Sequence, residues 1–322
     1  MIAPRDNLES HRLQRSVEGN NWLQARGGVI VASAAKGRPP DSARESSVEV
    51  GQILASRLDQ MYLKTPDVSM FVQSFGNGPQ TILAQGGWVG SGELWLPVFE
   101  GLSRSWRTVT YDHRGTGATI SREPRITFDM LVSDLFFVLD RLEVKQCVLA
   151  GESAGAAVVL EAALRQPGRF SGLILVGGRY TGERTPQRDR LLQGCRHDFA
   201  STMSAFVDAC VPEEDCEAER EWGKTIVMRS NAGAAIELLD CMEGIDIESR
   251  LGQLPMPTLV VHGSRDAITP LISSQKLAAS MPHAALTVID GAGHVPTVTR
   301  PERLAAEIEG FFGRGGAKLH QA

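Results

Sequence analysis

The feature that most constrains the fold of this chain is a series of short apolar runs, each of strand length, which alternate with helical patterns. Several runs are apolar at nearly every position, as is typical of strands buried on both faces of a parallel sheet. The runs are SMFVQSF (69–75), TILAQ (81–85), RTVTYD (107–112), CVLAG (147–151), GLILVG (172–177), TLVVHG (258–263) and ALTVID (285–290). Alternating strands and helices predict an α/β domain with a mainly parallel sheet flanked by helices.

Two of the segments between these runs show clear helical periodicity. FDMLVSDLFFVLDRL (128–142) places apolar side chains at the spacing of one helix face. PERLAAEIEGFF (301–312) begins with a proline, which is favoured in the first turn of a helix, and continues with the same spacing. Both segments are therefore predicted to be helices that cover the sheet.

The pattern divides the chain into three parts. Residues 1–60 show no sustained apolar period, except that GQILASRLDQMYL (51–63) looks helical. We expect this part to be irregular and loosely attached, or to form an arm over the core. Residues 181–250 have the pattern of several short amphipathic helices without a strand, which predicts a helical cap inserted over one end of the sheet. Residues 61–180 and 251–322 then form the α/β core.

Composition limits the classes of partner. The 322 residues carry a formal net charge of -5 and no concentrated stripe of Lys and Arg, so no nucleic-acid partner is expected. No apolar run reaches the roughly 18 to 20 residues that span a bilayer, and no secretory signal pattern is visible, which predicts a cytoplasmic protein. The five cysteines have no spacing typical of a metal site, and reduced thiols are expected.

One serine lies at the junction between a predicted strand and a predicted helix. Ser153 is the centre of GESAG (151–155), after the run CVLA and before AAVVLEAAL. A residue at such a turn stands at the carboxyl end of its strand, where open α/β sheets bind ligands. Gly151 and Gly155 fit a sharp turn in which strand and helix pass closely. The sequence therefore predicts that Ser153 is an exposed nucleophile rather than an ordinary turn residue.

A serine hydroxyl needs a base, and the base needs a carboxylate to orient it. His294 follows the last predicted strand, in VIDGAGHVPTVTRPE, and is the predicted base. His113 and His262 are the alternative bases. The turn that carries His113 is more typical of a packing role, and the position of His262 at the end of a strand is more typical of a structural role. Asp266, in HGSRDAITP, follows another strand and is the predicted partner of His294, although a turn or capping role is the alternative.

The order Ser153, Asp266, His294, with each residue just beyond a predicted strand, is the order of the α/β-hydrolase fold. Residues 67–313 resemble that superfamily through GESAG, HGSRDAITP, GAGHVPTVTRPE and the turn YDHRGTGAT. The resemblance implies an oxyanion hole built from the backbone N–H groups of Trp88 and Ala154. Where relatives commonly have His-Gly, this chain reads AQGGWVGSGELW, and a shift of one residue would move the first donor to Gly87.

This combination predicts a serine hydrolase that cleaves a carboxylic ester, lactone or thioester through an acyl-enzyme, with no cofactor and no metal. A carbon–carbon bond hydrolase and a cofactor-free haloperoxidase-like enzyme are alternatives, since the same three residues serve both. A ligand-binding protein without catalysis is the alternative outside enzymes. The expected partner is a small molecule with an apolar acyl or ring portion. Its expected contacts are Gly87, Glu152, Phe206 and Trp222.

Overall fold

The computed structural model describes residues 58–313, and these contain a sheet of nine strands. Along the sheet the order is β1-β2-β4-β3-β6-β7-β8-β9, and β5 pairs with β2. Strands β3, β4, β6, β7, β8 and β9 are parallel to one another. At one edge, β2 pairs antiparallel with both β4 and the edge strand β1. The strands are β1 (Leu58–Lys64), β2 (Val68–Phe75), β3 (Thr81–Gln85), β4 (Arg107–Tyr111), β5 (Ile120–Ser121), β6 (Cys147–Glu152), β7 (Phe170–Val176), β8 (Thr258–Gly263) and β9 (Ala284–Ile289). The seven predicted strands are confirmed.

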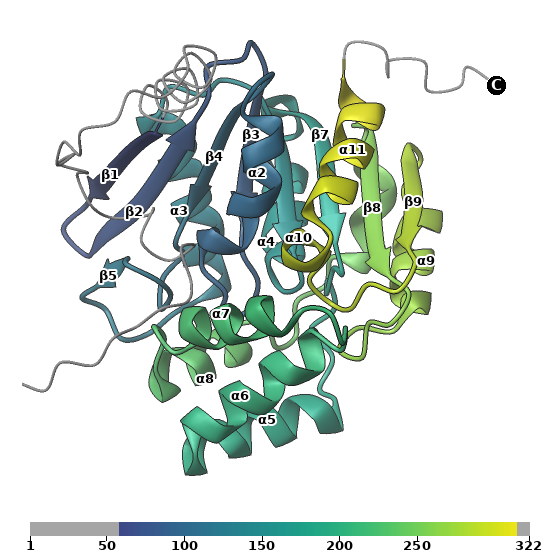
Figure 1. Cartoon of the computed structure of the whole chain (residues 1–322). Coiled ribbons are helices and arrows are strands. Elements are labelled where there is room, and N and C mark those ends of the chain that lie inside the picture. Colours follow the sequence, from purple (N-terminus) through teal and green to yellow (C-terminus); the bar gives the residue numbers. More distant parts are fainter. Residues whose placement is uncertain (1–57, 314–322) are drawn as a thin grey trace, which may run out of the picture. The chain divides into compact units, whose positions relative to one another are not determined.

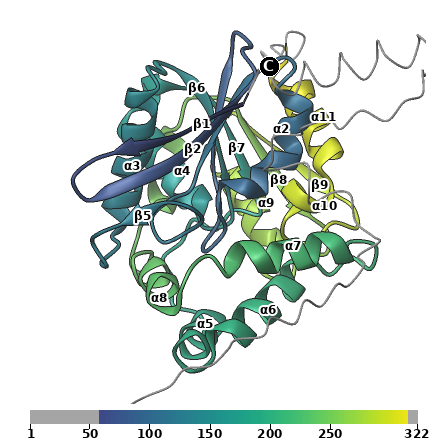
Figure 2. The same cartoon turned by 60° about the vertical axis from the view of Figure 1, so that its left-hand side comes forward.

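Helices cover both faces of the sheet, as Figures 1 and 2 show. On one face, α2 (Leu96–Leu102) and α11 (Pro301–Phe312) pack on each other and on the sheet, beside α10 (Pro296–Thr299). On the other face lie α3 (Phe128–Arg141), α4 (Gly155–Arg165) and α9 (Leu271–Ala279). The predicted helices over 128–142 and 301–312 are confirmed by α3 and α11. The sheet thus lies between two apolar layers, and the loops at the ends of its strands remain available for a functional site.

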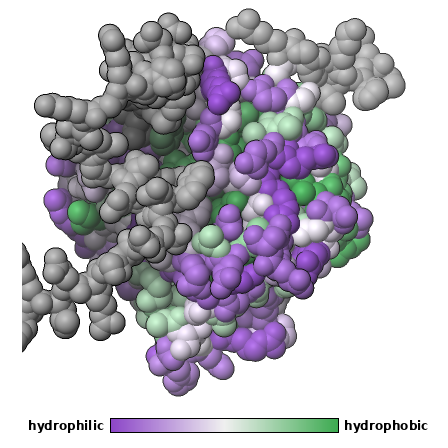
Figure 3. Space-filling model, viewed as in Figure 1, coloured by the Kyte–Doolittle hydropathy of each residue, from purple (hydrophilic) through white to green (hydrophobic). Residues whose placement is uncertain are grey.

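A helical insertion between β7 and β8 lies at the end toward which the parallel strands point (Figure 1). On the face in Figure 3 its outer surface is mostly hydrophilic, while residues such as Met203, Ile226 and Leu238 are buried. The insertion is therefore an amphipathic layer placed over the rim of the sheet. Its elements are α5 (Pro186–His197), α6 (Phe199–Cys210), α7 (Glu217–Val227), α8 (Ala232–Asp240) and the 3-10 helix η3 (Glu248–Gln253).

The helix predicted over 51–63 is wrong for Leu58–Leu63, which belong to strand β1. Met61 and Leu63 turn toward the core while Tyr62 and Lys64 are exposed, the period of two that marks a half-buried strand. Pairing with β2 decides the conformation here. The predicted boundary after residue 60 thus falls inside β1, and the rest of the predicted N-terminal part, residues 1–57, lies outside the described residues.

No helix among residues 58–313 combines the length and the apolarity that crossing a membrane requires.

Candidate active site

Ser153 stands at the sharp turn between β6 and α4, as its flanking glycines predict. Its φ of 51° lies in the left-handed region, which is unusual for a residue with a side chain. A Cβ on Gly151 would lie 2.8 Å from the carbonyl oxygen of Gly155, and one on Gly155 would lie 2.4 Å from that of Gly86. The two glycines therefore permit the close passage of strand, helix and neighbouring loop, and the turn presents Ser153 at the sheet rim.

Three side chains from separate loops form one chain of hydrogen bonds at this rim. Nε2 of His294 lies 2.8 Å from Oγ of Ser153, and its Nδ1 lies 2.8 Å from Oδ2 of Asp266. The side chain of Asp266 is fully buried, whereas Ser153 keeps 9% of its surface exposed. The structure thus brings together the three residues that the sequence singles out, and of these the serine borders both of the cavities described below.

The carboxylate of Asp266 is held in its ionised form. Burial by itself would raise its pKa, but the hydrogen bond and the charge of His294, with two backbone N–H groups, outweigh burial and lower the pKa. Those N–H groups belong to Ile268 and Thr269 and donate to Oδ1 at 2.8 and 2.9 Å. Oδ2 is therefore left to accept from His294.

The two alternative histidines occupy other positions. His262 is buried within β8, where Nδ1 contacts Oγ of Ser274 at 2.8 Å and Nε2 lies 3.6 Å from Asp266. His113 is buried beside the loop after β3, with Nε2 at 2.9 Å from the carbonyl oxygen of Gly87. Its Nδ1 lies 3.0 Å from the carbonyl oxygen of Arg114, so both ring nitrogens contact backbone carbonyls, and burial lowers the pKa of His113.

The contact of His113 with Gly87 orients the peptide group that joins Gly87 to Trp88. Because a trans peptide points its C=O and N–H in opposite directions, fixing the carbonyl of Gly87 also fixes the N–H of Trp88. The backbone of Gly87 lies against the serine, since a Cβ there would be 3.1 Å from Cβ of Ser153. Ala154 precedes α4, so its N–H has no acceptor within the helix. Sequence reasoning noted the turn that carries His113 but not this positioning contact.

The helical insertion holds the loop that carries His294, a contact that sequence reasoning missed. The backbone N–H of His294 donates to the carbonyl of Cys210 at 2.9 Å, at the end of α6. The N–H of Gly293 donates to Oε1 of Glu213 at 2.7 Å, and Glu213 is 1% exposed. The sequence alone carries no signal for this contact, because Glu213 is one of several acidic residues in the stretch that follows α6 and only the structure shows that it is buried.

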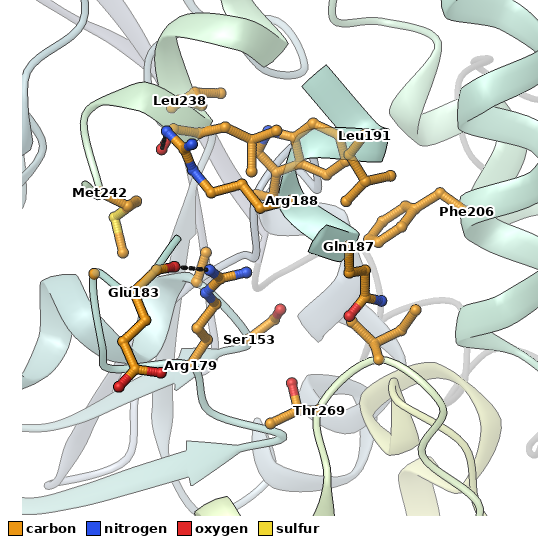
Figure 4. A pocket seen from close by; sticks show the side chains of 15 residues that line it. Ser153, Arg179, Glu183, Gln187, Arg188, Leu191, Phe206, Leu238, Met242 and Thr269 are labelled. Atoms are coloured by element: carbon orange, nitrogen blue, oxygen red, sulfur yellow. Dashed lines mark hydrogen bonds between the residues drawn. The ribbon is translucent and has the colours of Figure 1, made fainter. Parts of the chain in front are cut away.

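Two cavities meet at Ser153, and both are bordered by Trp88 and Phe206. Cavity A extends beneath α5 and α8, and Figure 4 shows the side chains that line it. Cavity B extends toward α6 and α7 and is bordered by Gly87, Glu152 and His294. Of the predicted substrate contacts, Gly87, Glu152 and Phe206 therefore border a cavity. Trp222 packs near Cys210 and Val295 and does not border cavity A or B.

Glu152 is a buried acid directly before the serine. Burial raises its pKa to about 7, while the charge of His294 and a hydrogen bond from Thr297 act in the opposite direction. Thr297 Oγ1 donates to its Oε2 at 2.8 Å. The side chain is thus committed to a contact with α10 and sits among the groups around His294.

Comparison with known proteins agrees with this architecture. Residues 82–307 match the family described as the alpha/beta hydrolase family. A protein from Agrobacterium fabrum named "Putative carbamate hydrolase RutD" is 28% identical over 241 residues, which is 72% of this chain and 92% of the relative. The pimeloyl-[acyl-carrier protein] methyl ester esterase of Nitrosomonas europaea is 26% identical over 251 residues, 74% of this chain and 97% of the relative.

Among solved structures, an esterase from Exiguobacterium antarcticum has the same fold. It aligns with a TM-score of 0.74 at 18% identity and covers 79% of this chain and 99% of its own. At that identity the likeness concerns the fold. Because the family match extends over most of the chain, from the third strand to the last helix, the protein belongs to the alpha/beta hydrolase family.

Proposed function

We propose that this protein is a serine hydrolase that cleaves a carboxylic ester, lactone or thioester through an acyl-enzyme. The observation that carries the proposal is the chain of hydrogen bonds from Ser153 through His294 to the buried Asp266. A neutral imidazole beside a serine hydroxyl can take its proton, and a carboxylate on the far ring nitrogen stabilises the imidazolium that forms.

The proposed reaction has two halves. Oγ of Ser153 attacks the carbonyl carbon as its proton passes to Nε2 of His294, and the carbonyl π electrons move onto oxygen. When the oxyanion collapses, the C–O or C–S bond breaks, and His294 gives its proton to the leaving group. Water then attacks the acyl-enzyme with His294 as base, and the acid leaves with Ser153 restored.

The developing oxyanion is proposed to accept hydrogen bonds from the N–H groups of Trp88 and Ala154. The orientation of the Gly87–Trp88 peptide by His113 favours Trp88 over Gly87 as the first donor. Donors of this kind each contribute roughly 2.7 to 4 kcal/mol to transition-state stabilisation. The names of the relatives, a carbamate hydrolase and a methyl ester esterase, support a substrate with an acyl carbonyl.

The test is covalent labelling of Ser153. A fluorophosphonate should label one residue of the folded protein, and peptide mapping should place the label in GESAG. Ser153→Ala should not be labelled and should lose esterase activity by about 10⁴- to 10⁶-fold. Ser280→Ala, a change at an exposed serine, is the matched control and should retain both properties.

Two outcomes would redirect the proposal. If the folded wild-type protein is not labelled, the serine-hydrolase mechanism fails, and a non-catalytic binding protein becomes the better explanation. If Ser153 is labelled but a panel of esters, lactones and thioesters is not turned over, the nucleophile stands and carbon–carbon bond cleavage becomes the leading reaction.

A further inference from the structure

Cavity A differs from cavity B in its charge. Most of the residues that line cavity A are apolar, among them Leu191, Leu238 and Met242. Two arginines, Arg179 and Arg188, also line it, whereas no Lys or Arg lines cavity B. Figure 4 shows Arg179 between Ser153 and Arg188. Cavity A is thus a largely apolar space whose wall contains two arginines and the exposed Glu183.

Arg179 is fixed beside the serine by its backbone. It follows β7 by three residues, and its N–H donates to the carbonyl of Ser153 at 2.9 Å. Its guanidinium donates to the backbone carbonyl of Glu183 at 3.1 Å and forms no ion pair with a carboxylate among residues 58–313. Burial and the positive charge of Arg188 both lower the pKa of Arg179, while the exposed Glu183 opposes them only weakly.

Arg188 reaches the same cavity from α5, and one of its nitrogens, Nη1, lacks a hydrogen-bond partner within residues 58–313 and lies 3.9 Å from Oδ1 of Asp189. Its side chain is 2% exposed, and Nη2 pairs with Asp240 at 2.8 Å and Glu243 at 2.9 Å. Nη1 is buried with no hydrogen-bond partner among the described residues. A buried donor without an acceptor is unfavourable, and a ligand oxygen at this position would supply the missing acceptor.

The placement of His294 distinguishes the two cavities. In the proposed reaction His294 gives its proton to the leaving group, so the leaving group must lie beside His294. Because His294 borders cavity B but not cavity A, the leaving group lies on the side of cavity B. The acyl chain of the substrate then extends into cavity A. Two arginine side chains line that cavity, and a carboxylate on the acyl chain would accept strong, charge-assisted hydrogen bonds from their guanidinium groups.

We propose that cavity A binds the acyl part of the substrate and that Arg179 and Arg188 bind a carboxylate at its far end, so that the preferred substrates are esters of dicarboxylic acids attacked at one carbonyl. This inference rests on the proposed function for the assignment of the two cavities. The apolar residues of cavity A contact the methylene groups between the scissile carbonyl and the carboxylate.

The experiment compares two series of p-nitrophenyl esters with acyl chains of five to eight carbons. One series ends in a carboxylate and the other in a carboxamide of nearly the same size, and spontaneous hydrolysis is subtracted. For at least one chain length we expect kcat/KM of the wild-type protein to be at least 30-fold higher for the carboxylate. Arg179→Gln should bring that ratio near 1, because the carboxylate loses a guanidinium that pairs with it.

Arg188→Lys should lower the same ratio, because lysine keeps the charge but lacks the second nitrogen of the fork. Arg190→Gln, on the exposed side of α5, is the matched control and should leave the ratio unchanged. A wild-type ratio near 1 at every chain length, or an unchanged ratio in Arg179→Gln, would overturn the inference.

A second measurement separates this inference from the proposed chemistry. In the Ser153→Ala background, heptanedioate binding is measured by titration calorimetry, with heptanediamide as the neutral control. Adding Arg179→Gln should weaken heptanedioate binding at least tenfold. If Ser153 resists the fluorophosphonate but this loss is seen, the carboxylate site stands and the hydrolase proposal fails. If Ser153 is labelled and heptanedioate binds no better than the diamide, the hydrolase proposal stands and the carboxylate site fails.

Discussion

The hydrogen bond between Asp266 and His294 decides which nitrogen of the ring carries the proton. A carboxylate can only accept, so Nδ1 of His294 must donate to it and Nε2 is left free to take the proton of Ser153. Asp266 is fixed in turn by the N–H groups that follow it in its own loop. The reactivity proposed for Ser153 therefore depends on an atom two hydrogen bonds away.

Asp266→Asn should lower kcat by about 10³- to 10⁴-fold while the protein stays folded. The amide oxygen can still accept from Ile268 and Thr269, but the amide nitrogen then faces Nδ1 and favours the tautomer with its proton on Nε2. Ester turnover and the melting transition test this together. Asp290→Asn, at an exposed aspartate, is the control, and a variant of Asp266 with near-normal kcat would contradict the assignment.

Ser153, Asp266 and His294 were predictable because each follows a strand of a parallel sheet. The carboxyl ends of such strands share one edge, so order along the chain is enough to bring the three together. Arg179 and Glu213 were not predictable in this way. Their roles depend on which side chain of an irregular loop turns inward, and on contacts between parts of the chain up to 80 residues apart.

At the scale of elements, the helical insertion positions the loops around the serine as well as covering them. Glu213 and Cys210 hold the loop of His294, and the indole N–H of Trp88 donates to the carbonyl of Ala235 in α8 at 2.8 Å. Phe206 of α6 packs edge-on against Trp88. Both the proposed base and the proposed oxyanion donor are thus tied to the insertion.

Glu213→Ala should lower kcat at least tenfold with a smaller change in KM, because the N–H of Gly293 loses its acceptor and the loop of His294 loses a support. The free energy of unfolding should fall by about 1 to 3 kcal/mol. Glu213→Gln keeps an oxygen acceptor and should restore most of kcat.

The neighbouring Glu214 is exposed, so Glu214→Ala serves as the matched control. Equal kcat in Glu213→Ala and Glu214→Ala would show that the contact with Gly293 does not position His294.

Elements with long periodic patterns were predicted correctly, and the short edge strand was not. The helix α3 has fourteen residues and a buried face that recurs three times, whereas β1 has seven residues at the sheet edge. A strand that short contains too few alternations of buried and exposed side chains to be distinguished from the helix-like spacing of the apolar residues that precede it. Its conformation follows from its pairing with β2, a contact that a local pattern does not contain.

At the scale of the whole molecule, Glu152 links stability to pH. Burial raises its pKa to about 7 in the folded protein, from a value of 4.5 without burial. The folded state therefore holds the proton more tightly than the unfolded state. For a carboxyl with a raised pKa, the contribution to stability is greatest below about 4.5 and is lost as pH rises through about 7.

Glu152→Gln should remove this pH dependence, since an amide does not titrate. Urea titrations give the free energy of unfolding of both proteins at each pH. The value for Glu152→Gln minus that for wild type should be larger at pH 8 than at pH 5 by about 2 to 3 kcal/mol, at roughly 1.4 kcal/mol per pKa unit. Glu302→Gln, at an exposed glutamate, should show no such difference between the two pH values. A parallel course of wild type and Glu152→Gln would mean that Glu152 is ionised without cost in the folded protein.

The left-handed backbone of Ser153 has a consequence for anyone who engineers this protein. That conformation costs a residue with a side chain on the order of 1 to 2 kcal/mol, and glycine adopts it freely. A library selected for heat resistance alone would therefore enrich glycine at position 153 and return robust, inert molecules. Selection must measure turnover in the same round, because at position 153 stability favours glycine whereas the proposed activity requires serine.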